Sequence, residues 1–121
     1  MQAELEAILS AGAIPAAIGG DHSLCIPGAR ALSAHFGPGK KMGYLQIDAH
    51  LDAGVDIGGE SQTNCNGLIR ASELPNLSPE NMAVIGVRGT INVPDWWDAV
   101  REREIPVYSI DSSAAPGTHR S

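Results

Sequence analysis

Short runs of consecutive apolar residues alternate along this chain with stretches whose apolar residues have helical spacing. An unbroken apolar run is typical of a strand covered on both faces, and such strands belong to parallel sheets. Strands that alternate with helices predict an α/β fold, a parallel sheet with helices on both faces and right-handed crossovers. The expected strands cover residues 14–18, 42–47, 82–87 and 106–110, and the expected helices cover residues around 5–9, 27–36 and 94–104.

Proline and glycine mark the ends of several of these elements. Pro27 and Pro94 suit the first turn of a helix, where a backbone N–H has no partner within the helix. Gly12 suits the position just after the first helix. The pair Gly19-Gly20 predicts a tight turn after the first strand, and a polar, glycine-bearing loop follows the second strand from residue 53 to residue 67.

Composition limits the classes of protein that fit. With 121 residues, 43% of them hydrophobic, the chain is one small domain or a piece of a larger one. A net charge of −6 argues against a nucleic-acid partner, which would require a basic surface. Cys25 and Cys65 form neither a disulfide framework nor a zinc motif. No apolar run reaches the roughly 20 residues of a membrane span, and the N-terminus lacks the basic start of a signal peptide, so a cytoplasmic protein without a membrane partner is predicted.

Polar side chains follow two of the expected strands, at residues 19–23 and 48–52. Ligands of open α/β sheets collect beyond the carboxyl ends of the strands. If residues 48–52 are extended, Asp48, His50 and Asp52 point the same way, because alternate side chains of a strand share a face. Carboxylate and imidazole groups are suited to manganese, zinc or iron. The alternative interpretation is a solvated loop in which two acidic residues occur together by chance.

His22 is the candidate ligand of the earlier cluster. A lone histidine is more often a structural residue than a metal ligand. Its position after a strand that could neighbour the strand before Asp48 changes this balance, because ligands from two adjacent strand ends would then converge. The sequence therefore predicts a metal site formed by both clusters.

At these two clusters the sequence resembles the ureohydrolase family of arginases, agmatinases, guanidinobutyrases and formiminoglutamases. The family signature has Gly-Gly-Asp-His-Ser after one strand and Asp-Ala-His-x-Asp after the next, and both motifs are intact at residues 19–23 and 48–52. The stretch 70–75 is most similar to agmatinase-type members, and Ile-Gly-Val-Arg-Gly at 85–89 also fits. The resemblance implies one incomplete ureohydrolase domain over residues 1–121, with an arginase-like three-layer architecture truncated at the C-terminus.

The resemblance also implies a binuclear manganese centre. His22, Asp48 and Asp52 would ligate one ion, and Asp48 and His50 would ligate the other, with Asp48 bridging. In the family a hydroxide between the two ions attacks the guanidinium carbon of a small substrate, giving urea and an amine. Asp21 would orient His22 or close the turn before it. A homo-oligomer is also expected.

The C-terminal end departs from the family pattern. The family completes its centre with Ser-x-Asp-x-Asp, and here only the start of that motif is matched, with Asp111 as the candidate ligand and Ser113 in place of the second aspartate. Residues 112–121 are expected to form an irregular tail. The C-terminal half, which grips the guanidinium group in the family, is missing.

The loop after the second motif departs as well. A family histidine thought to transfer a proton to the leaving amine would align with Asn64 or Cys65, and neither is a histidine. Asn64 is the candidate substrate-binding residue at that place, although its amide cannot act as an acid or base near neutral pH.

Three functions remain open at this point. The first is manganese-dependent hydrolysis of an agmatine-like guanidino compound. The second is an inactive, truncated ureohydrolase fragment with a partial metal site or a role in assembly. The third is a metal-dependent deacylase of the same architecture, which the paired motifs disfavour.

Overall fold

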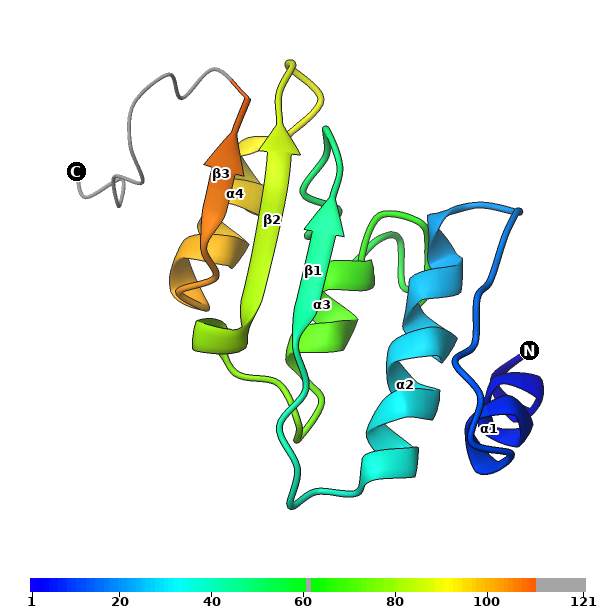
Figure 1. Ribbon diagram of the computed structural model, residues 1–121. Helices are drawn as coiled ribbons and strands as arrows, with labels where there is room; N and C mark the ends of the chain where they lie inside the picture. Colours follow the sequence, from blue (N-terminus) through cyan, green and yellow to red (C-terminus); the bar gives the residue numbers. More distant parts are fainter. Residues whose placement is uncertain (61, 111–121) are drawn as a thin grey trace.

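A parallel sheet of three strands forms the centre of the computed structural model, which describes residues 1–60 and 62–110. The strands are β1 (Tyr44–Ile47), β2 (Met82–Val87) and β3 (Val107–Ser109), in the order β1-β2-β3 (Figure 1). The predicted α/β fold with a parallel sheet is therefore confirmed. All three strands end at the same edge of the sheet, so the segments that follow β1 and β2 are neighbours in space.

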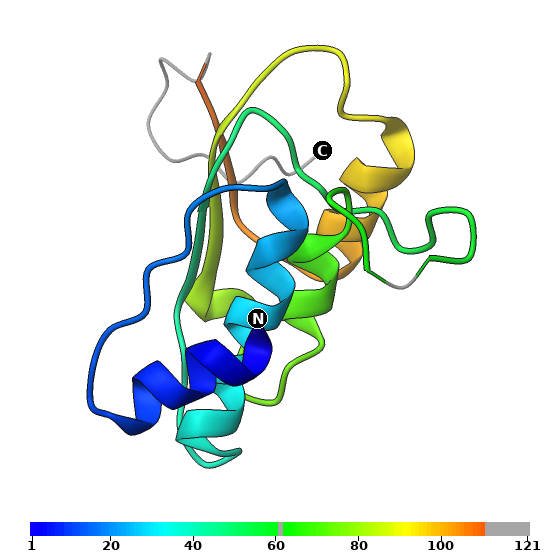
Figure 2. The ribbon, with the colours of Figure 1, turned by 90° about the vertical axis from the view of Figure 1, so that its right-hand side faces the viewer.

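Helices α2 (Cys25–Phe36), α3 (Gly67–Ser72) and α4 (Pro94–Glu102) cover one face of the sheet (Figure 2). The core lies between this helical layer and the sheet, because packing the two surfaces together removes their apolar side chains from contact with water. Its fully buried members include Leu51, Leu68, Ile69, Val84 and Val87.

The opposite face of the sheet carries exposed apolar side chains. Ile47, Ile85 and Tyr108 are paired across the three strands and form one row on this face. The side chain of Ile47 is 77% exposed, and Leu45 beside it on β1 is also exposed. Helix α1 (Gln2–Ser10) packs against α2, so within residues 1–60 and 62–110 no helix covers this row. A parallel sheet normally has both faces covered.

The strand predicted at residues 14–18 is wrong for the described structure. No regular secondary structure forms there, and Ile14 and Ile18 are 94% and 97% exposed. Figure 1 places this segment at the edge of the molecule, outside α2. A strand requires a hydrogen-bonded neighbour, and in the described part of the chain β1 pairs only with β2.

The other predicted elements are present, with small shifts at their ends. The first helix forms as α1, and Gly12 after it has φ +77°, as a residue that ends a helix often does. Helix α2 begins before Pro27 because a short 3₁₀ helix, η1 (His22–Leu24), leads into it. Helix α3 and the 3₁₀ helix η2 (Pro79–Asn81) were not predicted. The irregular tail predicted at residues 112–121 lies outside the described residues. Among the described residues, no helix has the length and hydropathy that a membrane span requires.

Candidate metal centre

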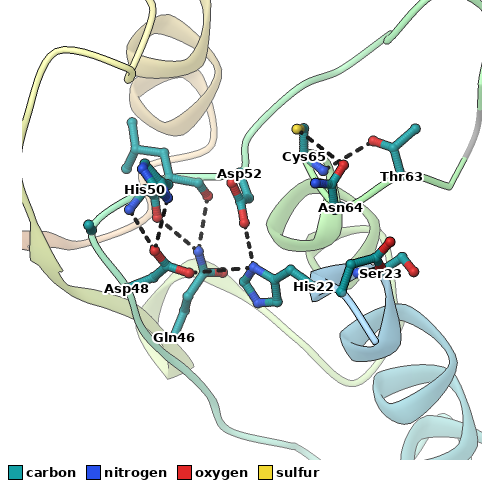
Figure 3. A network of polar contacts seen from close by, with 12 residues as sticks. His22, Ser23, Gln46, Asp48, His50, Asp52, Thr63, Asn64 and Cys65 are labelled. Carbon is teal, nitrogen blue, oxygen red and sulfur yellow. Dashed lines mark hydrogen bonds and ion pairs between the residues drawn. The ribbon is translucent and has the colours of Figure 1, made fainter. Parts of the chain in front are cut away.

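Three side chains converge where the carboxyl edge of the sheet meets the start of α2: His22, Asp48 and Asp52 (Figure 3). Each offers a nitrogen or oxygen atom, and these atoms lie within 4.8 Å of one another. Nδ1 of His22 is 3.5 Å from Oδ2 of Asp48 and also contacts Oδ2 of Asp52. Side chains from two separate parts of the chain therefore face a common point.

The turn before α2 brings His22 to this point. Gly19 and Gly20 have φ +109° and +62°, conformations that glycine adopts without steric cost. The carboxylate of Asp21 then accepts a hydrogen bond from the backbone N–H of Ser23 at 2.9 Å, and this bond lowers the pKa of Asp21. Asp21 thus closes the turn that carries His22, which is one of the two roles proposed for it from the sequence.

Residues 48–52 form a turn after β1, so the expectation of an extended segment is wrong. Oδ1 of Asp48 accepts a hydrogen bond from the backbone N–H of His50 at 2.8 Å, which folds the chain back on itself. Asp52 has φ +47°, in the left-handed region that few residues other than glycine adopt. Despite this turn, the carboxylates of Asp48 and Asp52 both reach His22.

His50 lies on the other side of the Asp48 carboxylate. Its Nδ1 is 3.3 Å from Oδ1 of Asp48, whereas His22 approaches Oδ2. Asp48 is therefore flanked by an imidazole at each of its oxygens (Figure 3). This is a suitable arrangement for a carboxylate that would bridge two cations, although the assignment of ligands stays a prediction.

The side chain of Gln46 supports the turn from below. It is buried on β1, and its amide nitrogen donates to the backbone oxygens of His50 at 3.1 Å and Leu51 at 3.3 Å. Asn92 also contacts this turn, through hydrogen bonds with the backbone of Leu51 and Ala49. Neither residue was selected from the sequence. The only available signal was that Gln46 is polar within an apolar strand.

The electrostatics of the cluster favour a cation. The side chain of Asp52 is almost fully buried, and burial raises the pKa of its carboxyl, to which repulsion by Asp48 adds while His22 lowers it. In the ion pairs of the described residues, Asp48 and Asp52 pair with histidines and with no lysine or arginine. Two carboxylates and an imidazole form a donor set suited to manganese, zinc or iron, so the residues fit a divalent metal.

Asn64 lies in the loop that passes beside the cluster (Figure 3). Its side chain is exposed, and its Oδ1 accepts a hydrogen bond from Sγ of Cys65 at 3.4 Å. Burial and the charge of Asp52 both raise the pKa of the Cys65 thiol, so this loop is within electrostatic reach of the cluster. A contact between Asn64 and substrate stays a prediction, and Asp111 lies outside the described residues.

An α/β sheet with histidine and aspartate residues gathered at its carboxyl edge defines a class of candidate metal-binding α/β proteins. Comparison with known proteins narrows this class, because the arginase family model matches residues 1–120. The chain belongs to the arginase family.

Two curated relatives and one solved structure show the extent of the match. The chain is 30% identical to proclavaminate amidinohydrolase of Streptomyces clavuligerus, covering 91% of this chain and 34% of that protein. It is 34% identical to guanidinopropionase of Pseudomonas aeruginosa, covering 84% and 31%. The structure of Trypanosoma cruzi formiminoglutamase with Mn²⁺ superposes with a TM-score of 0.80 at 18% identity, covering 95% of this chain and 39% of that one, which supports the fold alone. The chain thus spans about a third of the length of these curated relatives.

Proposed function

We propose that this chain supplies part of a binuclear manganese centre that hydrolyses a guanidino compound to urea and an amine. The observation that carries the proposal is the convergence of His22, Asp48 and Asp52, with His50 at the second oxygen of Asp48. Membership of the arginase family supports the same reaction class. Manganese is proposed because the two motifs at residues 19–23 and 48–52 resemble those of the ureohydrolases, for which a manganese centre is expected.

The side chains divide between two ions in this proposal. His22, Asp48 and Asp52 would hold the first ion, and Asp48 and His50 the second, with Asp111 as an additional ligand. When bound, such ions would make hydroxide available near neutral pH, because divalent cations lower the pKa of water. Asp52 must be ionised to take part, and a nearby cation offsets the cost of burying its carboxylate.

The substrate would bring its cationic guanidinium group to this acidic cluster. Asn64, on the neighbouring loop, would contact the remainder of the substrate through its amide. We propose an agmatine-like substrate from the sequence, and the names of the relatives, which include a guanidinopropionase, extend the candidates to guanidino acids. The catalytic acid or base is not assigned to any side chain.

Urea release tests this function directly. The purified chain is reconstituted with manganese and assayed against agmatine, arginine, guanidinobutyrate and guanidinopropionate. Urea production that Asp48→Ala abolishes supports the proposal. Asp98→Ala is the matched control, because Asp98 is an exposed aspartate on α4 whose only ion pair in the described residues is with Arg101. Urea release that survives Asp48→Ala, or no urea from a folded chain carrying two manganese ions, contradicts the proposal.

A second candidate is an inactive ureohydrolase fragment that holds one ion or serves in assembly. It is favoured by the size of the cluster in the described residues, because His22, Asp48 and Asp52 together are enough to hold one ion. Manganese stoichiometry separates the two candidates, since one bound ion without urea release fits the fragment. The homo-oligomer and the cytoplasmic location inferred from the sequence stay predictions, to be tested by light scattering and by localisation of a tagged chain.

A further inference from the structure

Asn92 lies in the loop between β2 and α4, next to the turn that carries the candidate ligands. Its Oδ1 accepts a hydrogen bond from the backbone N–H of Leu51 at 2.8 Å. Its Nδ2 donates to the backbone oxygens of Ala49 and Arg88, both at 3.1 Å. One carboxamide therefore joins the loop after β2 to the turn after β1.

The chemistry of these partners requires a carboxamide. A backbone N–H can only donate and a carbonyl oxygen can only accept, so the oxygen of Asn92 must face Leu51 and its nitrogen must face Ala49 and Arg88. An aspartate of the same shape would keep the first bond but would have no hydrogen to offer the two carbonyls. An alanine would lose all three bonds.

Ala49 and Leu51 alternate with the three candidate ligands of this turn, Asp48, His50 and Asp52. Fixing the backbone at both intervening residues fixes the directions in which the three side chains leave it. The turn needs such support because Asp52 is held in the left-handed region, a conformation with an energetic cost. The Arg88 N–H, which donates to the Ala49 oxygen at 3.0 Å, acts on the same segment from the same loop.

We propose that Asn92 is a positioning residue for the metal centre: it holds the backbone of residues 49–51 so that Asp48, His50 and Asp52 are preorganised for cations. This role rests on the proposed metal-binding function. Residues that orient metal ligands without touching the metal typically change metal affinity about 10–100-fold when they are removed.

Asn76 provides a matched control for Asn92. It is also an asparagine with three hydrogen bonds: its Oδ1 accepts from Oγ of Ser33, and its Nδ2 donates to the backbone oxygens of Gly37 and Lys40, both at 2.6 Å. These partners lie at the end of α2 and in the loop before β1, away from the carboxyl edge of the sheet. Loss of the Asn76 bonds should therefore weaken the fold without redirecting the candidate ligands.

The experiment compares the wild-type chain with Asn92→Ala and Asn76→Ala. Circular dichroism establishes that each is folded, electron paramagnetic resonance of free Mn²⁺ gives the dissociation constant, and hydrogen exchange by NMR follows the Leu51 amide without metal. Asn92→Ala is expected to raise the Mn²⁺ dissociation constant about 10–100-fold and to accelerate exchange of the Leu51 amide. Asn76→Ala is expected to lower the melting temperature while leaving both readouts close to wild type.

The outcomes separate this inference from the proposed function. Wild-type chain that binds no Mn²⁺ rejects the metal centre, and the Leu51 amide then decides whether Asn92 holds the turn. Wild-type chain that binds Mn²⁺ as tightly as folded Asn92→Ala overturns the positioning role. Unchanged exchange of the Leu51 amide in Asn92→Ala overturns it as well, and so does an equal loss of Mn²⁺ affinity in Asn76→Ala.

Discussion

The contact between α3 and the start of α2 decides whether Gly67→Ala raises or lowers the free energy of unfolding. Gly67, the first residue of α3, is buried against Cys25, the first residue of α2. A Cβ added at Gly67 would lie 2.3 Å from Sγ of Cys25 and 4.0 Å from its Cβ. Gly67 has no positive φ, so replacing it with alanine would otherwise stabilise the chain by roughly 0.4–1 kcal/mol, through the lower entropy of the unfolded state.

The clash with the sulfur reverses that expectation. Cys25 is half-buried, and overpacking at such a contact costs about 1–3 kcal/mol, so Gly67→Ala should lower the free energy of unfolding by roughly 0.5–2 kcal/mol after the entropic gain is subtracted. In a Cys25→Ala background the sulfur is absent and only the ordinary contact with Cβ remains. There, Gly67→Ala should be neutral or stabilising.

Urea denaturation followed by circular dichroism measures all four members of this cycle. The expected result is a change of sign between the two backgrounds, with a coupling energy of about 1–3 kcal/mol between the two positions. If Gly67→Ala stabilises the chain by the same amount whether or not residue 25 is cysteine, the two helices do not pack through this contact and the reasoning is refuted.

Of four further predictions, two concern the candidate site, one concerns the core and one concerns the uncovered face of the sheet. Burial raises the pKa of Asp52, so the folded chain loses stability as the pH rises above the usual pKa of an aspartate and this carboxyl has to ionise. Asp52→Asn should therefore raise the melting temperature of the metal-free chain more at pH 7 than at pH 4. Equal increases at the two pH values would contradict this. In the wild type, Mn²⁺ affinity measured by calorimetry should fall as the pH is lowered through the raised pKa of Asp52, since protons compete for its carboxylate. Leu68→Ala in the core should cost about 2–5 kcal/mol in urea denaturation, whereas the exposed Ile91→Ala should stay within about 0.5 kcal/mol. Ile47→Lys should leave the circular dichroism spectrum unchanged and reduce concentration-dependent association in light scattering. If Ile8→Lys on α1 reduces association equally, the uncovered face of the sheet is not the surface responsible.

The sequence predicted the strands of the sheet well because each is an apolar run that finds a neighbouring strand to pair with. The run at residues 14–18 is also apolar, but a strand depends on a pairing partner as well, which apolarity alone does not reveal. Helix α3 was missed because it is short and begins directly after the polar loop; its apolar side chains are buried only through contacts with distant elements. The hydrophobic pattern of the sequence therefore predicted which segments are apolar enough to form strands. Which of them pair in the sheet depended on contacts between distant parts of the chain.

The candidate site followed the same division. The types and spacing of His22, Asp48 and Asp52 were sufficient to expect that they would meet. The backbone that brings them together differs from the expectation. Residues 48–52 were expected to be extended, with alternate side chains on one face, but the Asp48 carboxylate accepts a hydrogen bond from the His50 N–H and the chain turns there. Asn92 escaped notice because a single asparagine in a loop carries no pattern, and its importance depends on backbone atoms far away in the sequence.

The left-handed backbone at Asp52 also limits how this position can vary. Among the standard residues, glycine, asparagine and aspartate tolerate such a conformation most readily. Two of these three lack a carboxylate, and each differs from aspartate by one nucleotide in the genetic code. A single base change can therefore remove a candidate metal ligand while the turn keeps its shape, so descendants of this chain could lose the chemistry of the site long before they lose its architecture.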